Sequence, residues 1–228
     1  MAKRPTIAKK VNKLAIAHAN HWLEWSLVSE VTGLIAGVDE VGRGALFGPV
    51  VAAAVILPSQ ILTASITAEI KDSKKLSSSR RNTLAQQICQ LAVDWKIGFA
   101  TTKEIDHLNI LQATLLAMKR AVLKLDTQPK LCLIDGNQFI QDISLPQKTI
   151  VKGDSLSLSI AAASIVAKVW RDDLIIRLAQ KYKLYDLHNN KGYGSARHLS
   201  ALQQYGPSPL HRLSFRPCQV SENISPSA

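Results

Sequence analysis

Short apolar runs of strand length alternate along the chain with stretches in which apolar residues recur at helical spacing. Leu34–Val38 is the first such run, and it leads directly into two adjacent carboxylates, Asp39 and Glu40. Four later segments have a similar length and composition, namely Val50–Leu57, Trp95–Thr101, Leu131–Ile134 and Lys148–Lys152. This pattern predicts an α/β protein.

The connections between these runs indicate how the strands pair. The short link between the first two runs favours antiparallel pairing. Leu131–Ile134 is apolar at consecutive positions, as expected for a strand that is covered on both faces. It ends, like the first run, in a carboxylate and a glycine turn, Asp135 and Gly136.

Helical periodicity appears between the strands. Leu84, Ile88 and Leu91 recur at i, i+4 and i+7, which predicts a helix with one buried face, and Ser77 can cap its start. The segment from Ser59 to Glu69 has no decisive pattern.

Two longer helices are predicted further along the chain. Apolar spacing from Leu111 to Leu125 indicates the first. The second, Ser157–Ala179, begins with the small residues Ala161–Ser164, which permit close packing against a sheet. In its second half Arg171–Asp173 indicates a polar patch, whose acids we assign to the surface or to a supporting role.

The charge of the chain favours a polyanionic partner. Lys and Arg number 28 against 17 Asp and Glu, a net charge of +11, so nucleic acid is preferred over a membrane; charge that serves only solubility is the alternative. No apolar run approaches the roughly 18 residues of a membrane span. The three cysteines form neither a metal pattern nor a disulfide framework, and we expect a cytoplasmic protein.

Acidic residues follow three of the predicted strands. Asp39 and Glu40 end the first run, Asp135 ends the fourth, and Asp154 follows the fifth. Solvated acidic turns are the simpler interpretation of any one of them. Four converging carboxylates, however, would repel one another unless Mg²⁺ or Mn²⁺ removed that cost. Two such ions about 3.5–4 Å apart can activate a water and stabilise a leaving phosphodiester oxygen. Acids within a basic chain therefore indicate a metal-dependent nuclease.

Three segments could hold a nucleic-acid strand. Gly42-Arg43-Gly44 permits close backbone approach to a phosphate, and the serine and lysines of Ser73-Lys74-Lys75 suit phosphate oxygens. Tyr193 lies between two glycines and could stack on a sugar or base. A solvated helix entrance and a packed loop tyrosine are the simpler interpretations of the last two.

Two other classes of protein remain open. A non-catalytic protein that binds nucleic acid would explain the basic charge but not the strand-end acids; the family resemblance given next makes RNA–DNA hybrids its expected ligand. A phosphotransferase could use similar acids, but the sequence has no GxxxxGK[ST] loop; GxSxG and HExxH are also absent.

The segment Gly37–Gly44 resembles the signature of the ribonuclease HII family. The similarity spans Gly33–Pro217 in the family's order, with Ala45 where the family often has proline. It continues through Asp72–Leu76, Leu133–Asn137, Val151–Ser155, Ile160–Lys168, Lys191–His198 and His211–Phe215.

The resemblance implies a ribonuclease H-like α/β fold, with a mixed central sheet flanked by helices and a C-terminal helical part. It implies endonucleolytic cleavage of RNA in RNA–DNA hybrids and incision 5′ of single ribonucleotides in duplex DNA, leaving a 3′-OH and a 5′-phosphate. We expect a monomer with a basic extension at residues 1–30, a catalytic domain at residues 31–217 and a disordered tail at residues 218–228.

The resemblance also assigns roles to individual residues. It makes Asp39, Glu40, Asp135 and Asp154 the catalytic acids that bind Mg²⁺ or Mn²⁺. Gly42, Arg43 and Gly44 would contact the ribonucleotide 2′-OH and the neighbouring phosphate, mainly through the backbone. Tyr193 would pack on the sugar beyond the scissile phosphate, and Ser73, Lys74 and Lys75 would hold the strand.

Overall fold

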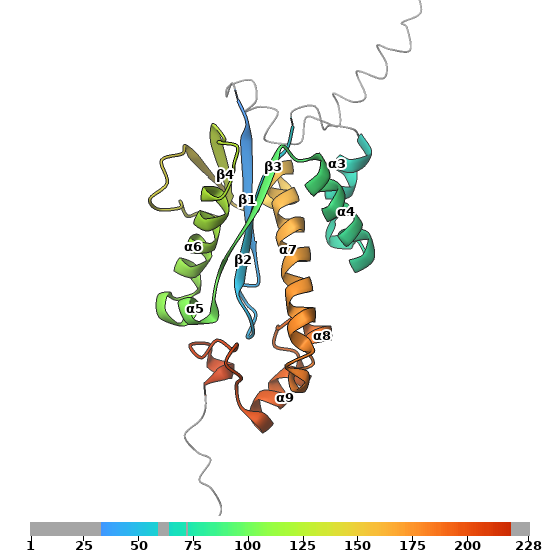
Figure 1. The fold of residues 1–228 in the computed structure, drawn as a ribbon, viewed down its shortest axis with the longest axis vertical. Coiled ribbons are helices and arrows are strands. Elements are labelled where there is room, and N and C mark those ends of the chain that lie inside the picture. Colours follow the sequence, from blue (N-terminus) through green and yellow to red (C-terminus); the bar gives the residue numbers. More distant parts are fainter. Residues whose placement is uncertain (1–32, 59–63, 72, 220–228) are drawn as a thin grey trace, which may run out of the picture.

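The computed structural model describes residues 33–58, 64–71 and 73–219 (Figure 1). The predicted N-terminal extension and most of the predicted tail lie outside these residues, as does the side chain of Lys74. None of the helices in the described part combines the length and apolar character that a bilayer span requires.

A mixed sheet of five strands forms the centre of the described protein. The strand order is β3-β2-β1-β4-β5, with β1 antiparallel to β2 and parallel to β4. The bounds are β1 Ile35–Val41, β2 Val50–Ile56, β3 Asp94–Ala100, β4 Leu131–Asp135 and β5 Gln147–Ile150. The five predicted strands and the antiparallel pairing of the first two are confirmed.

Helices cover both faces of the sheet (Figure 1). Helix α6 packs on β2 and β3 on one face, while α7 packs on β1 and β2 on the other, with α3 and α4 beside it. The smaller C-terminal helices gather beyond the end of α7, which confirms the predicted C-terminal helical part. The helices are α3 Ala64–Lys71, α4 Ser78–Leu91, α5 Thr102–Leu108, α6 Ile110–Leu123, α7 Leu158–Ala179, α8 Leu187–Asn190 and α9 Ala196–Tyr205. Short 3₁₀ helices are η1 Ser73–Lys75, η2 Gly153–Ser155, η3 Lys183–Tyr185 and η4 Arg216–Cys218.

The close approach of α7 to β1 depends on a glycine. A Cβ at Gly37 would lie 2.1 Å from the carbonyl carbon of Ser159. The predicted packing of small residues against the sheet is borne out, because Ala161–Ala163 are buried there. Ser157 caps the helix by accepting a hydrogen bond from the Ile160 N–H. The close packing at Gly37 fixes α7 over β1, the strand that carries two of the predicted acids.

Three details of the sequence prediction are corrected. Leu91 is 46% exposed because it is the last residue of α4, although Leu84 is buried as expected. Helix α5 was not predicted; a capping box at Thr101 begins it. Arg171 does not belong to a polar surface patch: its side chain is fully buried, because main-chain carbonyls satisfy its donors.

Candidate functional site

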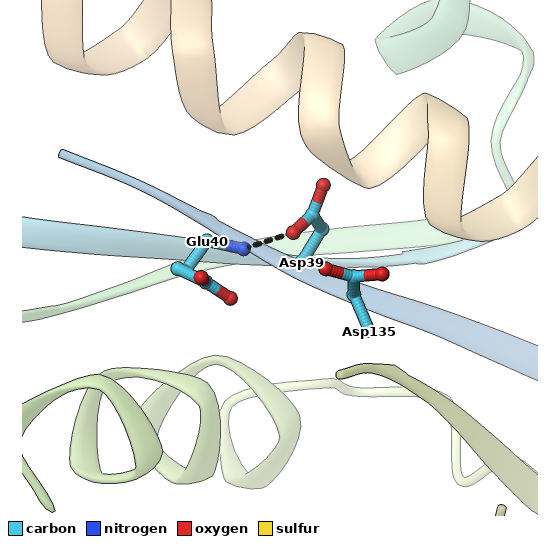
Figure 2. Close-up of side chains that lie close together, drawn as sticks. All are labelled: Asp39, Glu40 and Asp135. Atoms are coloured by element: carbon cyan, nitrogen blue, oxygen red, sulfur yellow. Dashed lines mark hydrogen bonds between the residues drawn. The ribbon is translucent and has the colours of Figure 1, made fainter. Parts of the chain in front are cut away.

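Two neighbouring parallel strands bring three acidic side chains together (Figure 2). Asp39 and Glu40 are consecutive on β1, and Asp135 is the last residue of β4. The pairing of Val38 with Ile134 places Asp39 beside Asp135. One carboxylate oxygen from each of the three acids lies within 4.8 Å of the others.

Hydrogen bonds fix the orientation of these carboxylates. The Glu40 N–H donates to Asp39 Oδ1 at 2.6 Å, and the Ser164 side chain of α7 also bonds Asp39. The Gly153 N–H donates to Asp135 Oδ1 at 2.7 Å, which ties the end of β4 to the turn after β5. Arg43 forms an ion pair with Glu40, in which Arg43 Nη1 lies 3.4 Å from Glu40 Oε1.

Burial and mutual repulsion make the three charges costly. Burial raises the pKa of Asp39 well above its usual value, and the charges of Glu40 and Asp135 raise it further. Burial likewise raises the pKa of Glu40, although Arg43 opposes the shift. A divalent cation would remove this cost, and an all-oxygen donor set suits Mg²⁺ or Mn²⁺. The residues present therefore fit such an ion.

Asp154 lies next to this group and not within it. It belongs to η2, and together with Glu40 it lines a cavity of 460 Å³. Basic and hydroxyl side chains complete the polar lining: Lys71, Arg81, Lys168, Ser73, Ser155 and Ser164. Acids and cations thus share one cavity, in which a metal ion and phosphate oxygens could both bind.

The glycine turn after β1 has a buried and an open side. Gly42 has φ +89°, and a Cβ there would lie 2.2 Å from Nε of Arg171, so both the backbone and the packing require glycine. Arg43 and Gly44 are exposed. No described atom lies within 4 Å of the position that a Cβ of Gly44 would take. The turn therefore presents its open side at Gly44.

Tyr193 lies beside this turn. Leu46 and Phe47 donate their N–H groups to the Gly192 carbonyl, at 2.7 and 3.2 Å, which joins the two loops. The Tyr193 ring is 36% exposed and lies 5.9 Å from Lys168 Nζ, a side chain of the cavity wall. The fold thus brings together the glycine turn, Tyr193 and the cavity. Among the predicted strand-holding residues, Ser73 lines the cavity and Lys75 is exposed.

A sequence model of the family Ribonuclease HII matches residues 36–218. The chain belongs to the ribonuclease HII family. It is 70% identical to the ribonuclease HII of Nostoc sp. (strain PCC 7120) over 211 residues. The matched region covers 92% of this chain and 94% of that protein. Membership confirms the prediction of a metal-dependent hydrolase of the ribonuclease H type.

Solved structures of ribonuclease HII relatives have the same fold. The ribonuclease H2 from Pyrococcus horikoshii OT3 matches with a TM-score of 0.71 and 27% identity, over 81% of this chain and 95% of that one. Bst-RNase HIII in complex with Mn²⁺ matches with a TM-score of 0.66 over 81% of this chain and 68% of that one. Its 21% identity makes this a likeness of fold alone. The predicted ribonuclease H-like fold is confirmed.

Several polar residues of this ribonuclease HII family member lie around the site without a role there having been predicted, among them Arg171, which was predicted to lie in a polar patch. Ser164, Lys168 and Arg171 follow one another at spacings of four and three on α7. They mark the face of the helix that lies over β1, and this periodicity could have identified them. Arg81 was also missed; it lies on α4, where it donates to the Ser73 and Leu76 carbonyls and holds the Ser73 turn.

Proposed function

We propose that this protein cleaves the RNA strand of RNA–DNA hybrids and incises duplex DNA on the 5′ side of a single ribonucleotide. The products carry a 3′-OH and a 5′-phosphate, and the enzyme acts as a monomer in the cytoplasm. One observation carries the proposal: a group of three buried or half-buried carboxylates, of which Glu40 lines a cavity with cationic walls, lies next to an exposed glycine turn.

Asp39, Glu40 and Asp135 would hold one or two Mg²⁺ or Mn²⁺ ions, with Asp154 contributing from the cavity. Bound there, such ions supply a nucleophilic water at neutral pH and stabilise charge on the phosphodiester. The hydrogen bonds to Asp39 and Asp135 keep both carboxylates in place without the ion. A protein that only binds hybrids gains nothing from this costly cluster, which favours the enzyme over that alternative.

The cationic wall of the cavity would hold the substrate strand. Lys71, Arg81 and Lys168 can contact phosphate oxygens near the carboxylates. Ser73, Lys74 and Lys75 would extend this contact along the strand. A phosphate that is held on the cationic side faces the acidic group across one cavity, as hydrolysis of its ester bond requires.

Recognition of a single ribonucleotide requires a contact to its 2′-OH, since that group alone separates it from deoxyribose. Gly44 is exposed, and apart from its chain neighbours no described residue lies within 4 Å of the position that a Cβ there would take. Tyr193, with its ring partly exposed, would pack on the sugar that follows the scissile phosphate. The backbone of Gly42, Arg43 and Gly44 would therefore read the ribose.

Three duplexes test the proposal: a continuous RNA–DNA hybrid, a DNA duplex with one ribonucleotide, and the same duplex made only of DNA. The wild type should cut the first two with either ion, and the second only on the 5′ side of the ribonucleotide. Asp135→Asn, which is nearly isosteric, should slow both reactions by orders of magnitude, while Asp173→Asn on the exposed side of α7 should not. Near wild-type rates in Asp135→Asn, or wild-type cleavage of the all-DNA duplex, would refute the assignment.

A further inference from the structure

Two fully buried arginines, Arg171 and Arg212, lie beneath the glycine turn, and their donors go to main-chain carbonyls. Arg171 donates to the Phe47, Pro49 and Lys191 carbonyls, at 3.0, 3.1 and 2.9 Å. Arg212 Nη1 donates to the Arg43 carbonyl at 2.8 Å and its Nε donates to the Gly48 carbonyl at 3.0 Å. Arg212 thus holds two carbonyls of the loop between β1 and β2, although it lies more than 160 residues away in the sequence.

The bond to the Arg43 carbonyl sets the direction of the next N–H group. In a trans peptide the C=O of one residue and the N–H of the next point in opposite directions. Because Arg212 holds the Arg43 carbonyl toward the protein interior, the N–H of Gly44 is directed away from it. Gly44 is exposed and a Cβ there would meet open space, so this N–H is directed toward the exposed side of the turn.

Stability alone does not account for Arg212. Its Nη2 is buried and has no hydrogen-bond partner among the described residues, and an unsatisfied buried donor is unfavourable. The guanidinium also lies over the Phe215 ring, with Cζ 5.2 Å from the centroid. Burial, and then the charge of Arg171, lower the pKa of Arg212 to about 9, so it remains a charged donor at neutral pH.

We propose that Arg212 is a positioning residue for ribonucleotide recognition. By holding the Arg43 carbonyl inward, it keeps the Gly44 N–H preset as a hydrogen-bond donor to the 2′-OH oxygen of the substrate. Arg212 touches neither the substrate nor the carboxylates and acts through the Arg43–Gly44 peptide. The inference rests on the proposed incision at single ribonucleotides and adds the residue that prepares that contact.

Binding preference tests this role separately from cleavage. In the Asp135→Asn background, dissociation constants are measured with Mg²⁺ for the single-ribonucleotide duplex and for the all-DNA duplex. Arg212→Lys keeps the charge but loses the planar fork that spans two carbonyls. It should lower the preference for the ribonucleotide about tenfold, the effect of one hydrogen bond of about 1.4 kcal/mol, and leave affinity for the DNA duplex unchanged.

Arg120→Lys is the matched control. Arg120 also donates to a main-chain carbonyl, that of Phe99 in β3, but from α6 and not to the loop that follows β1. It should leave the preference unchanged. Equal losses of affinity for both duplexes in Arg212→Lys would mean that Arg212 only stabilises the loop, and an unchanged preference would overturn the inference directly. Absence of any preference in the Asp135→Asn background would instead refute ribonucleotide recognition itself.

A second measurement needs no substitution at Arg212. In the ¹⁵N-labelled Asp135→Asn protein, the Gly44 amide resonance is followed by NMR during titration with each duplex. The amide proton should move downfield with the ribonucleotide duplex and much less with the DNA duplex. Identical shifts with both would show that the Gly44 N–H does not read the ribose, and Arg212 would lose its proposed role.

Discussion

Neutralising Asp39 should stabilise the metal-free protein while it abolishes activity. Asp39 is 5% exposed and lies within 4.8 Å of two further carboxylates. Asn is nearly isosteric and keeps an oxygen that can accept the Glu40 N–H, but it carries no charge. The Asp39→Asn variant therefore removes repulsion at little cost to packing.

The size of the effect follows from the spacing of the acids. Two unit charges 4.8 Å apart repel by about 3.5 kcal/mol at an effective dielectric constant of about 20. The separation of 4.8 Å is the greatest within the group, but the raised pKa of Asp39 lets a proton relieve part of the repulsion. We expect the free energy of unfolding to rise by about 1–2 kcal/mol, which for a chain of this size raises Tm by about 2–8 °C.

Thermal unfolding of the wild type and Asp39→Asn, in EDTA and then in millimolar MgCl₂, measures this difference in Tm. The variant should melt higher in EDTA. Mg²⁺ should raise the Tm of the wild type by more than that of the variant, because it binds the carboxylate group of the folded state only. Asp173→Asn, which removes an exposed carboxylate from α7, controls for net charge and should match the wild type throughout.

The pH dependence gives an independent check. Folding raises the pKa of Asp39 above the 3.8 of an unperturbed Asp, so the folded state keeps a proton that the unfolded chain has released. The wild type should therefore lose stability as pH rises through this window, and its deficit against Asp39→Asn should widen from about pH 4 upward. Coincident melting of the two proteins in EDTA at neutral pH would refute the repulsion, and an equal rise with Mg²⁺ would place the ions elsewhere.

Three further predictions concern packing, phosphate contacts and acid sensitivity. Gly37→Ala should lower the unfolding free energy by about 1–3 kcal/mol in urea titrations, because its Cβ would meet the backbone of α7, whereas Gly44→Ala should not. Replacing Lys74 and Lys75 with Ala should flatten the slope of log affinity against log salt by about one per lost phosphate contact; an unchanged slope would place those contacts elsewhere. Burial, and then the charge of His198, lower the pKa of His211 from 6.5 to about 4. Because the unfolded chain takes up this proton first, the unfolding free energy should decrease as pH is lowered from 6.5 to 4, and less steeply in His211→Gln.

The sheet could be predicted because its signals are local. Each strand is a short apolar run, and β4, covered on both faces, is apolar at consecutive positions. Helix α5 escaped prediction because its seven residues are too few for a periodic pattern, although Thr101 and Glu104 form a recognisable capping box. Leu91 was placed in the core because the helical spacing does not show that α4 ends there.

The sequence allowed prediction of the acidic residues of the candidate site, but not of the residues and turns that position them. Asp39, Glu40 and Asp135 stand at strand positions that the sequence reveals, and the parallel pairing brings them together. The position of Asp154 beside the group depends on the turn after β5, which the sequence pattern does not fix. The burial of Arg171 depends on carbonyls more than 120 residues away in the sequence, so no local pattern shows it.

Helix α7 links these parts because one of its faces meets both the acids and the loops. The absence of a side chain at Gly37 lets the helix approach β1, and this approach allows Ser164 to bond the Asp39 carboxylate. One turn further along, Lys168 enters the cavity wall, and the next turn brings Arg171 beneath the loops of the glycine turn and Tyr193. A shift of α7 along the strand would therefore disturb the carboxylates, the cavity wall and the loops together.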